Sequence, residues 1–203
     1  MFVDIGAINH QKNHLGTLKA FEIASRTCEN AKLAILGPIY ETVLMDELNA
    51  YIAAKGLEHK VVYCGAAPRS HEHFAMADAF VSGAFFEGGQ LILLEAIRSN
   101  LPIVTSRVGF ASSFEGRPGI EVVPPPQDIA KYEGEIWELK STQLFESQMA
   151  DAMIRTWKDP VRPNFSDEEL SKLERSTSYE QYSVLVKAQL SRDEKHAAEV
   201  QTA

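Results

Sequence analysis

Short apolar segments alternate with helical patterns up to about residue 125, and this alternation constrains the fold more than any other feature of the chain. Most gaps between the apolar segments exceed the roughly twelve residues that a crossover between parallel strands requires. We therefore predict an α/β domain with a doubly wound, mainly parallel, six-stranded Rossmann-like sheet. The expected strands are residues 2–5, 32–36, 60–64, 79–81, 102–105 and 120–123.

The carboxy-terminal third of the chain has a different pattern. The run Pro124–Pro126 ends the alternation, and helical spacing resumes at Phe145 and stops at Asp159. Farther on, Ser166 is followed by three acidic residues, which is typical of an N-cap and the first turn of a helix. We therefore expect a Rossmann-like domain over residues 1–158 and a helical extension over residues 159–203.

Composition excludes several classes of protein. The 203 residues are 45% hydrophobic, which is enough for a full core, and the net charge of −8 argues against nucleic acid as a partner. No apolar run approaches the roughly 18 residues of a membrane span, and no signal-peptide pattern opens the sequence. Cys28 and Cys64 are too few for a disulfide framework, so we expect reduced thiols and a cytoplasmic protein.

A charged residue interrupts the most apolar stretch of the chain. Residues 91–97 read as a helix that is apolar on every side except at Glu95. Burying an unpaired carboxylate costs several kcal/mol, so Glu95 should meet a fixed donor. The hydroxyl groups of a ligand would serve, and a Lys or Arg of the protein is the alternative. Gly88 and Gly89 just upstream allow a backbone to pass close to a ligand.

The spacing of Glu87, seven residues and Glu95, followed by Ala96-Ile97 and later by residues 101–105, resembles the donor-binding signature of family 4 (group 1) retaining glycosyltransferases. The resemblance covers roughly residues 2 to 160. It implies the carboxy-terminal half of a GT-B fold, in which two Rossmann-like domains enclose the reaction. It also implies transfer from a nucleotide sugar without a metal ion or other cofactor.

The turn after the first expected strand is similar to the family's diphosphate-binding turn. It begins at Gly6, and Lys12 falls on the position of a lysine that contacts phosphate. Ala7 stands where the family has an arginine, and Arg107 is our candidate for a replacement cation. The alternative for Lys12 is a solvated residue at a helix start. His10 and His14 flank Lys12, and we expect both to lie in a surface loop.

The resemblance assigns further roles near the two glutamates. Glu87 and Lys12 are the implied catalytic residues, with Glu87 beside the donor sugar, although Glu87 could also be a plain surface residue. Glu95 would accept hydrogen bonds from ribose. The remaining implied donor-binding positions are Gly6 and Ala7 in the first turn, Gly65 and Ala66 near the base, Gly88, Gly89 and Gln90 in the acidic loop, and the backbone N–H groups of Leu91 and Ile92.

Two of these positions leave alternatives. Gln90 either hydrogen-bonds a sugar hydroxyl or caps the following helix. His71 and His73 could share a metal ion, but a solvated helix face is favoured because no third ligand is evident. We therefore predict no metal site.

The leading functional hypothesis is the donor-binding domain of a retaining hexosyltransferase in polysaccharide biosynthesis. Its donor would be a UDP-, GDP- or ADP-linked sugar and its acceptor a saccharide or a lipid-linked saccharide. An amino-terminal acceptor domain, in the same or a separate chain, would be needed for turnover. Tyr179, Tyr182, Leu185 and Val186 would form the surface that crosses to it. The full enzyme could associate peripherally with the inner face of the membrane.

Two alternatives remain, and one further class is disfavoured. The chain could be a non-catalytic module that binds nucleotide sugars in regulation, or half of a sugar-nucleotide 2-epimerase. A dinucleotide-dependent oxidoreductase is disfavoured because no G-x-G-x-x-G follows the first expected strand.

Overall fold

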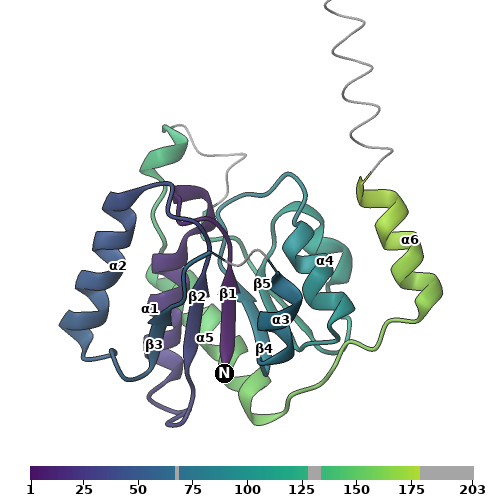
Figure 1. Ribbon diagram of the computed structural model, residues 1–203, viewed down its shortest axis with the longest axis horizontal. Coiled ribbons are helices and arrows are strands. Elements are labelled where there is room, and N and C mark those ends of the chain that lie inside the picture. Colours follow the sequence, from purple (N-terminus) through teal and green to yellow (C-terminus); the bar gives the residue numbers. More distant parts are fainter. Residues whose placement is uncertain (67–68, 128–133, 179–203) are drawn as a thin grey trace, which may run out of the picture. The chain divides into compact units, whose positions relative to one another are not determined.

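The computed structural model describes residues 1–66, 69–127 and 134–178. Six strands form one sheet in the order β3-β2-β1-β4-β5-β6, and every neighbouring pair is parallel (Figure 1). The predicted doubly wound parallel sheet is confirmed, and no strand end differs from its expected position by more than one residue. The strands are β1 (Phe2–Ile5), β2 (Leu33–Leu36), β3 (Val61–Tyr63), β4 (Ala79–Ser82), β5 (Ile103–Ser106) and β6 (Ile120–Val123).

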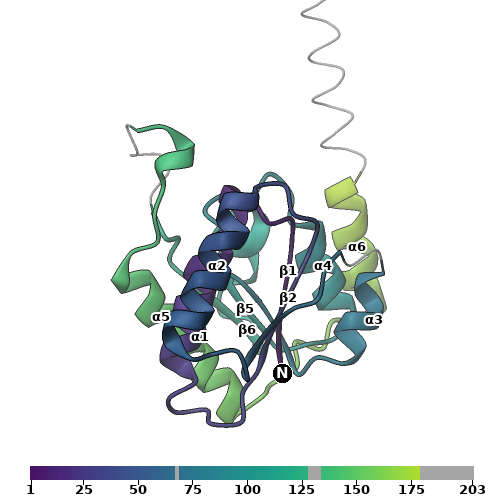
Figure 2. The ribbon, with the colours of Figure 1, turned by 60° about the vertical axis from the view of Figure 1, so that its left-hand side comes forward.

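Helices cover both faces of this sheet. Figure 2 shows α1, α2 and α5 on one side and α3 and α4 on the other. Within the described part of the chain, no helix combines the length and apolarity that crossing a bilayer requires. The helices around the sheet are α1 (His14–Ala24), α2 (Thr42–Lys55), α3 (Ser70–Ala75), α4 (Leu91–Arg98) and α5 (Gln143–Lys158), with 3-10 turns η1 (His10–Lys12), η2 (Gly109–Phe114) and η4 (Ile136–Glu138).

The core on the α1 and α5 side is built around the first strand. Phe2 packs against Phe21 of α1 and Trp157 of α5, with ring centroids 6.4 Å and 6.1 Å apart. Burying an aromatic ring of this size contributes about 2 to 3 kcal/mol. Successive strand residues point to opposite faces, so Asp4 lies on the same side of the sheet as Phe2. β1 therefore sends one carboxylate into the layer that holds α1.

Local signals in the sequence set the ends of several helices. Asn13 adopts a left-handed conformation with φ 50°, and its side-chain oxygen accepts a hydrogen bond from the Gly16 N–H at 3.2 Å, which starts α1. Gly56 caps α2 in a left-handed conformation with φ 64°. The predicted stop of α5 at Asp159 is confirmed.

In doubly wound α/β folds, ligands bind where the strand order of the sheet reverses, and here the reversal occurs at β1. β1 pairs with β2 on one side and β4 on the other, so the strand order reverses between β1 and β4. The chain leaves β1 toward α1 on one face of the sheet and leaves β4 toward α4 on the opposite face. A crevice opens where such neighbouring connections diverge, at the carboxyl ends of the strands.

The chain divides into one unit of residues 1–164 and a second of residues 165–203. In the second unit, α6 spans Asp167–Ser178. Ser166 is its N-cap, as predicted: the Glu169 N–H donates to the Ser166 hydroxyl at 3.3 Å, and the Glu169 carboxylate accepts from the Ser166 N–H at 2.8 Å. The predicted crossing residues Tyr179, Tyr182, Leu185 and Val186 lie outside the described residues.

Candidate functional site

The loops that follow β1 and β4 lie side by side at the carboxyl edge of the sheet. The Gln11 carbonyl accepts a hydrogen bond from the Phe85 N–H at 2.9 Å, and the Gln11 amide donates to the Phe86 carbonyl at 3.0 Å. The Asn13 amide donates to the Gly83 carbonyl at 2.8 Å. These bonds fix the first turn against the acidic loop, so the two form one structural element.

Lys12 and Glu87, the two implied catalytic residues, meet within this element. The Lys12 ammonium forms an ion pair with the Glu87 carboxylate, which also accepts from the Gln11 amide at 3.3 Å. The Glu87 side chain is only 5% exposed and that of Lys12 is 20% exposed. Neither is therefore a plain surface residue. Glu87 is a shielded carboxylate with two fixed donors, and its position is strongly determined.

The prediction that Glu95 is buried is wrong. Glu95 is exposed, and its carboxylate accepts a hydrogen bond from the Ser70 hydroxyl at the start of α3. The helix α4 is not buried on every side, because Leu91 is 57% exposed. The buried face of α4 carries Leu93, Leu94, Ala96 and Ile97. Glu95 thus lies on the outer side of α4, toward the connection that follows β3.

The start of α4 offers backbone donors beside the acidic loop. Gly88 and Gly89 are exposed, and no atom lies within 4 Å of the place where a Cβ would stand on either. The Leu91 N–H donates to the Gly89 carbonyl at 2.9 Å. The Ile92 N–H has no hydrogen-bond partner among the described residues. Of these two predicted phosphate donors, Ile92 is the one whose N–H remains available.

Gln90 lies under the loop that follows β5. It is 2% exposed, and an added Cβ on Gly109 would stand 3.8 Å from the Gln90 Cγ. Gln90 stands at the N-cap position of α4, but its side chain makes no capping hydrogen bond, so the capping alternative is not supported. Its buried amide oxygen has no partner among the described residues. The sugar-contact alternative therefore stays a prediction.

Glycines bring the turns after β1, β2 and β3 together. A Cβ on Gly6 would stand 3.1 Å from the Lys12 side chain, which runs across it. A Cβ on Gly37 would stand 1.8 Å from the Gly6 carbonyl oxygen, and Gly37 has φ 151°. The Gly37 N–H donates to the Gly65 carbonyl at 2.7 Å, and Ala66 beyond it is exposed. Gly37 therefore contacts both Gly6 and Gly65 and holds the three turns together.

A buried ion pair lies beneath the first turn, where sequence reasoning expected a surface loop. The His14 Nδ1 is 2.8 Å from the Asp4 carboxylate, and both side chains are almost fully buried. Burial lowers the pKa of His14, but the charge and hydrogen bond of Asp4, together with the Ala7 and Gly6 carbonyls, outweigh it and raise the pKa above 6.5. The available signal was Asp4 itself, a carboxylate inside a buried strand.

The other cation and histidine candidates have different surroundings. Arg107 pairs with Glu115 at 2.7 Å in the connection after β5. His71 and His73 lie on α3 as predicted. Within residues 1–66, 69–127 and 134–178, no group of three or more His, Cys, Asp or Glu side chains is placed to hold a metal ion.

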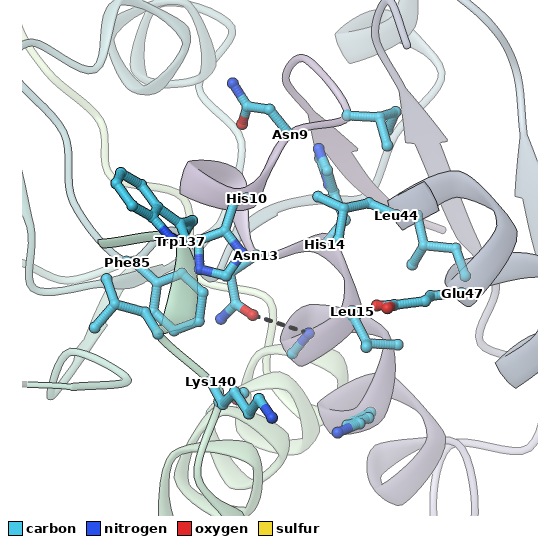
Figure 3. Close-up of a pocket in the computed structure, with 16 residues that line it drawn as sticks. Asn9, His10, Asn13, His14, Leu15, Leu44, Glu47, Phe85, Trp137 and Lys140 are labelled. Carbon is cyan, nitrogen blue, oxygen red and sulfur yellow. Dashed lines mark hydrogen bonds between the residues drawn. The ribbon is translucent and has the colours of Figure 1, made fainter. Parts of the chain in front are cut away.

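A cavity of about 440 Å³ lies behind η1, between α1, α2 and the segment that precedes α5 (Figure 3). His10, Phe85 and Trp137 form an aromatic wall, in which the His10 ring stacks on Phe85 at 5.2 Å. His14 also lines this cavity, whereas Lys12 and Glu87 do not. The ion pair of Lys12 and Glu87 and this cavity are therefore separate features.

Strand order and the divergent loops after β1 and β4 define a Rossmann-like α/β domain, a fold class in which ligands bind at the carboxyl edge of the sheet. The family model for group 1 glycosyl transferases matches residues 1–155. The chain belongs to this family, and the predicted resemblance is confirmed.

Known proteins agree with this assignment. An uncharacterized glycosyltransferase of Methanocaldococcus jannaschii is 26% identical over 106 residues, which cover 52% of this chain and 25% of that protein. Sucrose-phosphate synthase of Thermosynechococcus elongatus superimposes with a TM-score of 0.63 at 18% identity, covering 97% of this chain and 46% of that one. Thus this chain spans less than half the length of these two proteins.

Two further structures share the fold. The C-terminal domain of the group 1 glycosyl transferase LpcC of Francisella tularensis gives a TM-score of 0.60 at 18% identity and covers 78% of this chain and 76% of that one. Anabaena HepE, solved in complex with UDP and glucose, gives 0.58 at 16% identity and covers 86% and 46%. The fold is therefore that of the carboxy-terminal domain of GT-B glycosyltransferases.

Proposed function

We propose that this chain is the donor-binding domain of a retaining glycosyltransferase, which transfers a hexose from a nucleoside diphosphate sugar to a saccharide or lipid-linked acceptor. The observation that carries the proposal is the meeting of Lys12 and Glu87 at the reversal of strand order, in a chain of the group 1 family. An acceptor-binding domain outside this chain would complete the catalytic site.

The groups at the crevice suit a diphosphate. A diphosphate is bound best by cations and by backbone N–H groups at the start of a helix. Lys12 supplies a cation, and Ile92 supplies an N–H in the first turn of α4 that no described residue accepts. The same groups would stabilise the charge that develops on the leaving nucleoside diphosphate, without a metal ion.

Glu87 and Glu95 suit hydroxyl-bearing parts of the donor. The Glu87 carboxylate is held by Lys12 and Gln11, so it can orient a sugar without reorganising. Glu95 is exposed and its carboxylate accepts a hydrogen bond from the Ser70 hydroxyl. A ribose bound there would be close to a carboxylate that accepts two hydrogen bonds. Several solved relatives in fold were crystallised with UDP, which makes uridine the first base to test.

Thermal unfolding in the presence of UDP, GDP and ADP tests this proposal. One of these should raise the Tm by about 5 °C at roughly one hundred times its dissociation constant, because binding to the native state alone stabilises it. The matching nucleoside should give a smaller rise, and added EDTA should not reduce the effect. No rise in Tm with any of the three diphosphates would overturn the proposal.

A further inference from the structure

The His14 ring is surrounded by hydrogen-bond acceptors on both sides. Its Nδ1 faces the Asp4 carboxylate at 2.8 Å, and its Nε2 is 3.2 Å from each of the carbonyl oxygens of Gly6 and Ala7. None of these groups can donate, so all three contacts are hydrogen bonds only when both ring nitrogens carry a proton. The contacts therefore favour an imidazolium ion directly beneath the first turn.

These contacts fix the orientation of one peptide group. The Gly6–Ala7 peptide is trans, so its C=O and N–H point in opposite directions. Because the Gly6 carbonyl is directed at His14, the Ala7 N–H is directed away from it. The N–H groups on either side are paired, Gly6 with the Leu36 carbonyl and Ile8 with the Pro38 carbonyl, both at 2.8 Å.

The Ala7 N–H, in contrast, has no hydrogen-bond partner among the described residues. A backbone donor next to a fully paired turn is normally satisfied by protein, water or ligand. The aliphatic part of the Lys12 side chain runs across the adjacent Gly6, so this N–H belongs to the same turn that Lys12 covers. A backbone N–H beside a lysine is a suitable donor for a phosphate oxygen.

We infer that His14, held by Asp4, is a positioning residue that turns the Ala7 N–H toward the diphosphate of the donor. The inference rests on the proposed function, because it assigns one more phosphate donor to the same site. His14 itself does not touch the ligand. If either ring nitrogen lost its proton, His14 would lose its hydrogen bond to Asp4 or its hydrogen bonds to the two carbonyls. The peptide would then lose its fixed orientation.

Other ionisable side chains lie in the surroundings of His14. Asp4 from β1 contacts His14 directly. The cavity that His14 lines has four other ionisable side chains, which are His10 from η1, Lys19 from α1, Glu47 from α2 and Lys140 from the segment before α5 (Figure 3). None of them contacts a ring nitrogen of His14 in the described part of the chain. His10 is the other histidine, so it provides the matched control for a pH experiment.

The test measures dissociation constants of UDP, with GDP and ADP in parallel, for the parent and for His14→Gln from about pH 6 to about pH 9. Near pH 6 the variant should bind its diphosphate roughly tenfold more weakly. The parent should lose a similar factor as the pH rises through the pKa of His14, whereas the ratio of His10→Gln to the parent should stay constant. Comparing variant and parent as a ratio of dissociation constants at each pH cancels the effect of ligand ionisation on the affinity.

Asp4→Asn and the Ala7 amide separate a positioning role from loss of fold. Asp4→Asn keeps an acceptor but removes the charge that raises the pKa of His14, so the affinity loss should shift to lower pH. The Ala7 amide signal in NMR spectra should shift with diphosphate in the parent and not in His14→Gln. Equal affinities of parent and His14→Gln at every pH would overturn the inference alone. Failure of the parent to bind any diphosphate would overturn the proposed function with it.

Discussion

The Lys12 ammonium and the Glu87 carboxylate form an ion pair although 75 residues separate them in the chain. The pair bridges the loops after β1 and β4, the two strands between which the strand order reverses. A phosphate at this crevice would have to share Lys12 with Glu87. The affinity of the site for an anion therefore depends on both side chains, and so does the orientation of the carboxylate.

Replacing Lys12 should separate phosphate binding from base binding. We expect Lys12→Ala to weaken the binding of UDP roughly tenfold and the binding of uridine hardly at all, because only the diphosphate loses a charge-assisted hydrogen bond. The free energy of unfolding should fall by about 1 to 3 kcal/mol, since Glu87 loses one of its two donors. Calorimetry and urea unfolding measure the two effects. Lys32→Ala, at an exposed lysine, is the control, and an equal loss for UDP and uridine would remove Lys12 from the phosphate site.

Replacing Glu95 should affect binding without affecting the fold. Glu95 is exposed and contacts Ser70, so Glu95→Ala should change the free energy of unfolding by no more than about 0.5 kcal/mol. The rise in Tm produced by nucleoside diphosphate should disappear, because ribose loses its acceptor. The exposed Glu58→Ala is the matched control, measured by thermal unfolding with and without UDP. A full ligand-induced rise in Glu95→Ala would show that the carboxylate plays no part in binding.

Replacing Gly37 should damage both stability and the first turn. The added Cβ of Gly37→Ala would stand 1.8 Å from the Gly6 carbonyl oxygen, at a φ of 151° that other residues rarely adopt. We expect a loss of at least about 3 kcal/mol in the free energy of unfolding. Gly88→Ala, which meets nothing within 4 Å, should fall within about 0.5 kcal/mol of the parent. Similar urea midpoints for the two variants would contradict the close approach of Gly37 and Gly6.

The buried pair of Asp4 and His14 should make stability depend on pH. The pKa of His14 is raised above 6.5 in the folded chain, so its stabilising contribution is complete below pH 6.5 and is lost as the pH rises through the higher, folded pKa. The free energy of unfolding of the parent should therefore decline across this window, while that of His14→Gln changes less. Urea unfolding at a series of pH values measures both. A parallel decline in the two proteins would assign the effect to other groups.

The fold was predictable because its signals are local. Each strand is a short apolar run, and Gly56 and Ser166 mark helix ends through conformations that neighbouring residues determine. The family signature likewise lies within one segment, from Glu87 to Glu95. Pattern and spacing were therefore enough for the sheet, its helices and the family.

The contacts of the site were less predictable because they depend on which loops become neighbours. Glu95 seemed buried because Leu91 was counted as core, but Leu91 is on the exposed side of a short helix. The partner of Glu87 comes from the first turn, and the partner of His14 from β1. Only Asp4, an acidic residue within a buried strand, signalled such a pair in the sequence.

The approach of Gly37 to Gly6 also matters for engineering the donor preference of this enzyme family. The backbone of one turn occupies the space in which the other would carry a side chain, so an insertion in either turn forces a compensating change in its neighbour. Libraries that diversify residues 6–7 should leave position 37 as glycine or vary both turns together. Separate randomisation would mostly sample misassembled variants instead of new specificities.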